Sequence, residues 1–201
     1  MELNLKHECT KDLSELSPLL HLAMSELKKS FMRVGGLEAH FGFECDTEEQ
    51  AIEGIPNAGM FLKSQKLKNV LGSVLRAFAH HLTEEGKKPT ICFSACEAWQ
   101  SLPVDKMDTE TLARLNENGV GEEEDKREVL MFNFENKTQL RMITYEIIRS
   151  GDDFVVSPEP IVDSITDKEP GQMVTKFQIW VDGKIYDDGS ELGFEFGRDE
   201  E

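Results

Sequence analysis

The residues best placed for chemistry lie where one expected strand ends and the next begins. Glu97 and Trp99 stand at the end of the apolar segment 90–98, and Arg127 and Glu128 open a second strand. If these strands are antiparallel neighbours, the four side chains meet at one edge of a sheet. An Arg–Glu pair beside a Trp could form a binding pocket there, although we favour a structural ion pair with a packed Trp. With the acids of the intervening loop added, the candidate binding residues are Glu97, Trp99, Arg127, Glu128, Glu122, Glu123, Glu124 and Asp125.

A group of His and Cys residues suggests zinc, but its spacing does not support that interpretation. Structural zinc sites favour Cys-x2-Cys near a turn, whereas Cys92 and Cys96 form Cys-x3-Cys within an expected strand, which separates their sulfurs. His80 and His81 diverge on the helix before them. A nucleophilic Cys96 would need a positioned base, and the neighbouring Glu97 would raise its pKa. We therefore predict buried thiols, no metal site and no cofactor, and leave catalytic residues unassigned.

Two amphipathic helices are expected from apolar residues at helical spacing. The first begins after Ser17, which caps it, and ends before Gly35. The second covers residues 64–86, because Gly86 supplies the left-handed residue that often follows a helix. Its apolar stripe must pack on another element, and Arg76 is expected on the opposite, polar face.

Strand patterns dominate the rest of the chain. Residues 37–44 alternate in polarity, and residues 90–98 are apolar on both sides, which is typical of a central strand. A hairpin is expected at 129–149, with Asn136 at positive φ, and another around an Asp-Gly turn at 173–186. Further expectations are a helical turn within 46–52, a short helix within 108–115, and a surface linker at 151–172 with one strand at 154–156. We predict an α+β fold, a mostly antiparallel sheet with two main helices packed on it.

Charge is unevenly distributed along the 201 residues, whose net charge is −17. Residues 105–125 carry a net −6 and residues 150–201 a net −10, whereas the remainder is nearly neutral. Acidic surfaces repel phosphate, so no direct nucleic-acid binding is expected, and a protein partner with a basic surface is permitted. We predict one domain at 1–201, with an acidic insert at about 100–128 and an irregular acidic part at about 151–201.

The sequence also bears on cellular location. No run approaches the ~20 apolar residues of a membrane helix, and the N-terminus lacks the basic-then-apolar layout of a signal peptide. The four cysteines do not form a disulfide framework, which fits a reducing compartment. We therefore predict a cytoplasmic protein without membrane contact.

Three short motifs carry a resemblance. They are Ala-Cys-Glu-Ala-Trp at 95–99, Arg-Glu-Val-Leu at 127–130 and Tyr-Glu-Ile-Ile-Arg at 145–149. Together they resemble a set of uncharacterised small bacterial and phage proteins, which share an apolar strand ending in Ser-Glu-Ala-Trp, a polar insert, an Arg-Glu-Val-Leu strand and a Tyr-x-Ile-x-Arg strand. Cys96 replaces the serine here. That set has no activity to transfer, so the resemblance implies a fold and leaves the function open.

Three functional hypotheses follow, while the oligomeric state stays undetermined. The first is a non-enzymatic binding or regulatory protein that contacts a basic partner. The second is a phage-type inhibitor that mimics the charge of DNA and blocks a nucleic-acid-binding or defence protein. The third is a small hydrolase or transferase with a strand-end site near Glu97. An open pocket lined by Cys96, Glu97 and Arg127 would favour this enzyme, and we prefer the non-enzymatic hypothesis.

Overall fold

The computed structural model describes most of the chain between residues 12 and 186. The described ranges are 12–47, 51–55, 57–63, 65–100, 126–151, 153–169, 178–181 and 183–186. Most of the acidic insert expected at about 100–128 lies outside the described residues, from 101 to 125, with Glu122, Glu123, Glu124, Asp125 and the short helix expected within 108–115. Its described ends belong to strands, because Gln100 ends one and Arg127 begins the next. In the described part of the chain, no helix is long and apolar enough to cross a membrane.

Both expected helices are present with the predicted caps. Helix α1 (Pro18–Val34) begins where the Ser17 hydroxyl accepts a hydrogen bond from the Leu20 N–H at 3.2 Å. It ends at Gly35, whose φ of 78° is in the left-handed region. Helix α2 (Gln65–Glu84) is followed by Gly86 at φ 80° and is preceded by the 3-10 helix η1 (Ala58–Lys63). The local sequence therefore sets both ends of α1 and the end of α2.

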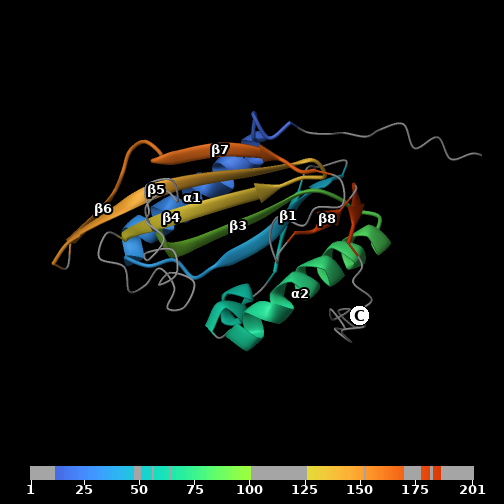
Figure 1. Cartoon of the computed structure of the whole chain (residues 1–201), viewed down its shortest axis with the longest axis horizontal. Coiled ribbons are helices and arrows are strands. Elements are labelled where there is room, and N and C mark those ends of the chain that lie inside the picture. The colour runs from blue at the N-terminus through green and yellow to red at the C-terminus, as the bar shows by residue number, and fades with distance from the viewer. Residues whose placement is uncertain are drawn as a thin grey trace, which may run out of the picture.

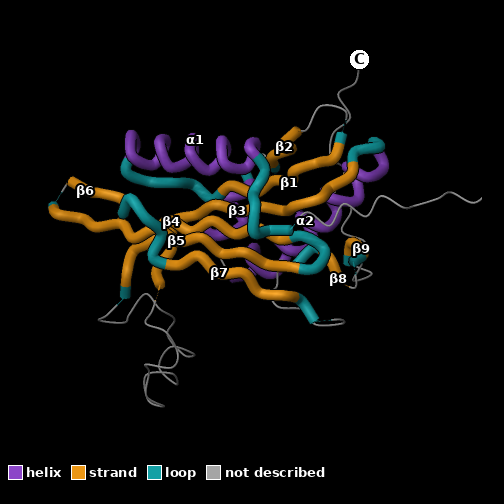
Figure 2. Tube along the Cα trace, turned by 90° about the horizontal axis from the view of Figure 1, so that it is seen from above, coloured by secondary structure: helices purple, strands orange, loops and turns teal. Residues whose placement is uncertain are grey.

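The strands form one main antiparallel sheet and one small hairpin. The main sheet has the order β2-β1-β3-β4-β5-β6, and β7 pairs with β5 next to β6 (Figure 2). Strands β8 and β9 form the separate hairpin. The bounds are β1 (His40–Asp46), β2 (Ala51–Gly54), β3 (Lys88–Gln100), β4 (Arg127–Glu135), β5 (Gln139–Ser150), β6 (Asp153–Val156), β7 (Val162–Asp167), β8 (Trp180–Val181) and β9 (Lys184–Ile185). The predicted α+β class is confirmed, and β3 is central, between β1 and β4.

The two helices cover opposite faces of the sheet (Figure 1). Alternation along β3 sends Ile91 and Phe93 to the face that packs against α1, and Cys92 to the face that packs against α2. We call these the α1 face and the α2 face. On the α2 face, Phe41 and Phe43 of β1 join the apolar stripe of α2, Leu71, Leu75, Ala79 and Leu82. Helix α2 thus lies over β1 and β3, and the same face of β4, β5 and β7 has no described helix above it (Figure 1).

Several local expectations are wrong. Residues 51–54 form strand β2 rather than the end of a helical turn, because they pair with Gly42 to Cys45 of β1. The expected linker at 151–172 contains the predicted β6 but also β7, which pairs with the first half of β5. Asn136 does not adopt positive φ. Its side-chain oxygen instead closes the turn by accepting hydrogen bonds from the N–H groups of Thr138 at 2.8 Å and Gln139 at 2.6 Å.

Arg76 is also placed differently from the expectation. It is buried rather than on an open polar face, and its guanidinium donates to the carbonyl of Gln178 at 3.5 Å. It also lies 5.3 Å from the ring centroid of Tyr186. The segment around the β8–β9 hairpin therefore covers the part of α2 that the helix pattern alone marks as solvent-facing.

Candidate functional site

The predicted strand-end residues do meet at one edge of the sheet. In the β3–β4 register, Trp99 lies opposite Glu128, and Gln100 lies opposite Arg127. Directly opposite residues share a face, and neighbours along a strand alternate. Glu97, Trp99 and Glu128 therefore belong to the α1 face, whereas Arg127 belongs to the α2 face. The expected Glu97–Arg127 pair does not form, because the sheet separates the two side chains.

Arg149 of β5 takes the place that the sequence suggested for Arg127. Its guanidinium donates hydrogen bonds to both carboxylate oxygens of Glu128, with Nε 2.6 Å from Oε2. It also donates to Oε1 of Glu97 at 3.1 Å. The same guanidinium lies 3.4 Å from the carbonyl oxygen of Gly35, and Glu97 accepts from the Leu37 N–H at 3.4 Å. The cluster therefore ties the end of α1 and the chain after it to the sheet.

The two carboxylates of this cluster have pKa values displaced in opposite directions. Hydrogen bonds from Arg149 hold the pKa of Glu128 below its ordinary value. Burial, with the nearby Glu128 carboxylate as a further cause, raises the pKa of Glu97. Such a split can serve acid–base chemistry when a substrate reaches both groups. Here the carboxylates are already bonded to Arg149 and to the backbone, so the arrangement fits a structural ion cluster.

The remaining predicted residues lie around this cluster without joining it. Trp99 is 49% exposed, and the ammonium of Lys126 lies 4.7 Å from its ring centroid. On the other face, Arg127 Nε is 4.0 Å from Oε1 of Glu146, and the Arg127 side chain is half exposed. Cys96 also lies on the α2 face, whereas Glu97 lies on the α1 face. Cys96 and Glu97 therefore do not line a common pocket. The arrangement that would have favoured the enzyme hypothesis is therefore not formed by these side chains.

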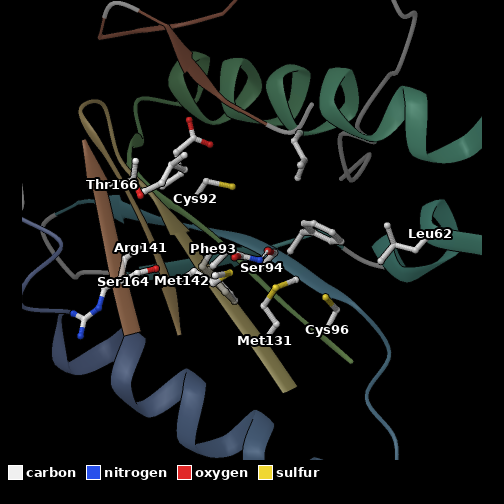
Figure 3. A pocket seen from close by; sticks show the side chains of 15 residues that line it. Leu62, Cys92, Phe93, Ser94, Cys96, Met131, Arg141, Met142, Ser164 and Thr166 are labelled. Carbon is white, nitrogen blue, oxygen red and sulfur yellow. Dashed lines mark hydrogen bonds between the residues drawn. The ribbon is translucent and has the colours of Figure 1, made fainter. Parts of the chain in front are cut away.

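A cavity of about 480 Å³ lies on the α2 face of the sheet (Figure 3). Its floor is made by alternate residues of β3, β4, β5 and β7, and its wall on one side by β1, η1 and α2. Figure 3 shows Leu62 at one end and Thr166 toward the other. The side chains or backbone that line it belong to Phe41, Leu62, Leu75, Cys92, Phe93, Ser94, Cys96, Met131, Asn133, Glu135, Leu140, Arg141, Met142, Ser164 and Thr166.

The cavity results from small side chains on the sheet and from the position of α2. Cys92, Ser94 and Cys96 are the α2-face residues in the middle of β3, and none of them is bulky. Helix α2 packs on the larger Phe41 and Phe43 of neighbouring β1. The small side chains of β3 therefore do not fill the space beside the helix, and a cavity lined mostly by apolar atoms remains.

The thiols in the cavity are poor nucleophiles. Burial raises the pKa of Cys92 well above its ordinary value, and the Glu135 carboxylate adds to the rise. Burial also raises the pKa of Cys96. Since the thiolate is the reactive form, both groups are protonated at neutral pH and act as apolar lining. Among the described residues no group of His, Cys, Asp and Glu side chains could hold a metal ion.

A buried ion pair lies at one end of the cavity. The Lys168 ammonium is 2.7 Å from Oε1 of Glu135, and the two side chains are 4% and 8% exposed. The Glu135 carboxylate also accepts from the N–H groups of Ile179, at 2.8 Å, and Trp180, at 3.1 Å. Burial raises the pKa of Glu135 and lowers the pKa of Lys168. The pair therefore joins β4, the chain after β7 and the β8–β9 hairpin.

Sequence reasoning did not identify this cavity or this ion pair. The available signal was the division of β4 into two faces, with Leu130, Phe132 and Phe134 on one and the more polar Met131, Asn133 and Glu135 on the other. A strand with one fully apolar face and one mixed face indicates that the mixed face is incompletely covered. The partner of Glu135 carries no comparable signal, because Lys168 lies in a segment expected to be a linker.

Comparisons with known proteins give no further guide to this site. No protein family, no curated protein and no solved structure matches the chain.

Proposed function

We propose that this chain is a non-enzymatic binding protein and that the cavity on the α2 face is its binding site. The observation that carries the proposal is the cavity itself, about 480 Å³ and lined mostly by apolar groups with a few polar ones. Small-molecule sites typically have volumes of about 300–1,000 Å³ and this kind of lining. The protonated thiols and the internally bonded Glu97–Glu128–Arg149 cluster support binding rather than catalysis.

The size of the cavity sets the scale of the expected affinity. At about 30 Å³ for each water-sized group, 480 Å³ holds on the order of 16 non-hydrogen atoms. A contribution of about 0.3 kcal/mol per atom gives about 5 kcal/mol of binding free energy. This corresponds to a Kd of about 0.2 mM, or tighter for a ligand that fills the space well. Optical titration can measure such affinities directly.

Diphenylhexatriene, a neutral, rod-shaped hydrocarbon dye, is a suitable probe for the first test, because its narrow shape suits the cavity. We expect its fluorescence to rise on binding to the wild-type protein and to the Ser94→Ala variant, because Ala keeps a small side chain in the floor of the cavity. Ser94→Leu places a larger side chain in the middle of the floor, so dye affinity should fall about tenfold or more. Ser150→Leu is the matched control, because Ser150 is exposed at the far end of β5. Equal dye binding by the Ser94→Leu and Ser150→Leu variants, with both folded, would contradict the proposal.

Contact with a basic protein partner is a second candidate, favoured by the charge distribution. Residues 105–125 and 150–201 together hold most of the excess acid in the chain. A complex formed through these segments should weaken as salt rises, since exposed charges are screened. Salt-insensitive capture of a partner would count against this candidate. A cytoplasmic location belongs to the same proposal and is supported by the free thiols of Cys45, Cys92 and Cys96.

A further inference from the structure

We infer that the ligand of this cavity is a neutral, single-chain amphiphile with one hydroxyl or amide group, rather than a carboxylate, a phosphate ester or an amine. This inference rests on the proposed function, because it specifies what the same cavity binds. The charges around the cavity, its polar groups and its shape support this ligand.

The charges that line the cavity are already engaged. The Arg141 side chain leaves the cavity toward α1 (Figure 3) and makes two 2.8 Å hydrogen bonds to Asp163 and one of 2.7 Å to the Leu13 carbonyl. Lys168, beside the cavity, is bonded to Glu135. An anionic ligand would therefore lose its hydration without gaining a positive partner among the described lining residues, which is costly.

A cationic ligand is disfavoured for a related reason. Glu135 is the acidic residue among those that line the cavity. Its carboxylate already receives the Lys168 ammonium and the N–H groups of Ile179 and Trp180. An amine would have to displace one of these donors from a buried position. The cavity thus suits a ligand without net charge.

One polar pair in the floor can anchor such a ligand. The Asn133 amide donates to the Ser94 hydroxyl at 3.3 Å, across the β3–β4 pairing. Asn133 retains a second N–H and its amide oxygen, and Ser94 retains its hydroxyl hydrogen. A ligand hydroxyl or amide can both donate to and accept from this pair. The surrounding Cys96, Met131 and Met142 are apolar, so the pair fixes the position of a single polar group.

The shape of the cavity indicates a chain rather than a compact molecule. Its lining runs across β1, β3, β4, β5 and β7, which are successive neighbours in the sheet. Four interstrand spacings of about 4.8 Å give a length of about 19 Å. A volume of 480 Å³ over that length leaves a mean cross-section of about 25 Å². Contacting carbon atoms lie about 4 Å apart, so this width admits one hydrocarbon chain.

Competition against bound diphenylhexatriene tests the inference with ligands that share a dodecyl chain. We expect dodecanol and dodecanamide to displace the dye from the full-length protein at least tenfold more effectively than dodecanoate or dodecylamine at pH 7.5. Lowering the pH to 5 should strengthen displacement by dodecanoate, because its neutral acid becomes populated. In the Asn133→Leu variant, whose side chain has the same number of non-hydrogen atoms and the same branching, dodecanol affinity should fall about fivefold, as expected for one lost hydrogen bond.

The outcomes separate the inference from the function on which it rests. Preferential displacement by dodecanoate or dodecylamine would overturn the neutral-ligand inference and leave the binding function standing. Unchanged dodecanol affinity in the Asn133→Leu variant would overturn the assigned anchor. Dye that binds the Ser94→Leu variant as well as the wild type would show that the cavity is not the site, which refutes the proposed function itself.

Discussion

The buried Glu135–Lys168 pair allows a quantitative test of how the cavity end is held together. Replacing Lys168 with Met keeps an unbranched side chain of similar length and removes the ammonium that lies 2.7 Å from Glu135. The Trp180 carbonyl also loses a donor at 3.2 Å, but keeps the Gln178 amide at 2.9 Å. The main consequence is therefore a buried carboxylate without its counter-charge.

The expected loss of stability is large because neither group is screened by solvent. Removing one member of a buried ion pair costs about 3–5 kcal/mol. Glu135 retains the N–H donors of Ile179 and Trp180, which favour its charged form. We therefore take the lower end, about 3 kcal/mol of unfolding free energy at pH 8. Lys184→Met is the control, because Lys184 is exposed on the neighbouring β9, and its effect should stay within about 0.5 kcal/mol.

The loss should depend on pH in a defined direction. Burial already raises the pKa of Glu135 above its ordinary value of 4.5, and removing Lys168 raises it further. The folded variant then binds a proton that the unfolded chain releases, so its stability falls as pH rises above about 4.5. Relative to wild type, we expect a deficit of about 3 kcal/mol at pH 8 that shrinks to about 1 kcal/mol at pH 5. A loss of packing alone would give the same deficit at both pH values.

Urea unfolding followed by circular dichroism, and by Trp180 fluorescence in a Trp99→Phe background, measures these differences. Trp180 is buried beside the pair, with the Lys168 ammonium 5.9 Å from its ring centroid, so it reports on this region. Combining Lys168→Met with Glu135→Gln should recover much of the loss, because Gln removes the charge and keeps an acceptor for the two N–H groups. Additive single and double variants, or a pH-independent deficit, would refute the reasoning.

Two further predictions concern the sheet and the strand-end cluster. Gly42→Ala should lower the unfolding free energy by about 1–3 kcal/mol, because the new Cβ would lie 2.7 Å from the Phe93 ring. Gly54→Ala is the control and should leave the unfolding free energy nearly unchanged in the same urea titration, because the nearest atom is 4.0 Å away. Arg149→Gln should cost about 1 kcal/mol at neutral pH because the cluster is partly exposed. This cost should decrease as the pH falls toward the lowered pKa of Glu128, and a cost that is the same at neutral and at acidic pH would contradict an ionic origin.

Local patterns in the sequence were sufficient for most of the framework. Ser17 and Gly35 mark the ends of α1 because capping depends on side chains within a few positions. The apolar residues of β3 identify a central strand because a strand covered on both faces has no polar side. Strand β7 was missed because prolines flank it and because it is an exposed edge strand with acidic residues, whose pattern is weak.

Partners distant in sequence were not predictable in the same way. The strand-end cluster was expected to pair Glu97 with Arg127, but adjacent strand positions alternate, and a shift of one residue moves a side chain to the other face. The β4–β5 register, together with the position of α1, brings Arg149 to Glu97 across 52 residues. Lys168 reaches Glu135 from 33 residues away in the same manner. Such pairs follow from the strand register, which the sequence pattern alone left open.

The cavity follows both from local sequence patterns and from contacts between residues distant in sequence. It is therefore a better guide to function than the strand-end cluster that the motifs suggested. The small residues in the middle of β3 are visible in the sequence. They leave a cavity only because larger side chains beside them hold a neighbouring element away from the sheet. Helix α2 packs on Phe41 and Phe43 of β1 and on Cys92 of β3, and its Leu75 lines the cavity whose floor includes Ser94 and Cys96. Filling this space with Ser94→Leu changes the stability of the ligand-free protein in the same way whether the space is a packing defect or a binding site. The distinguishing result is therefore dye binding, which Ser94→Leu should weaken and Ser94→Ala should preserve if the cavity is a binding site.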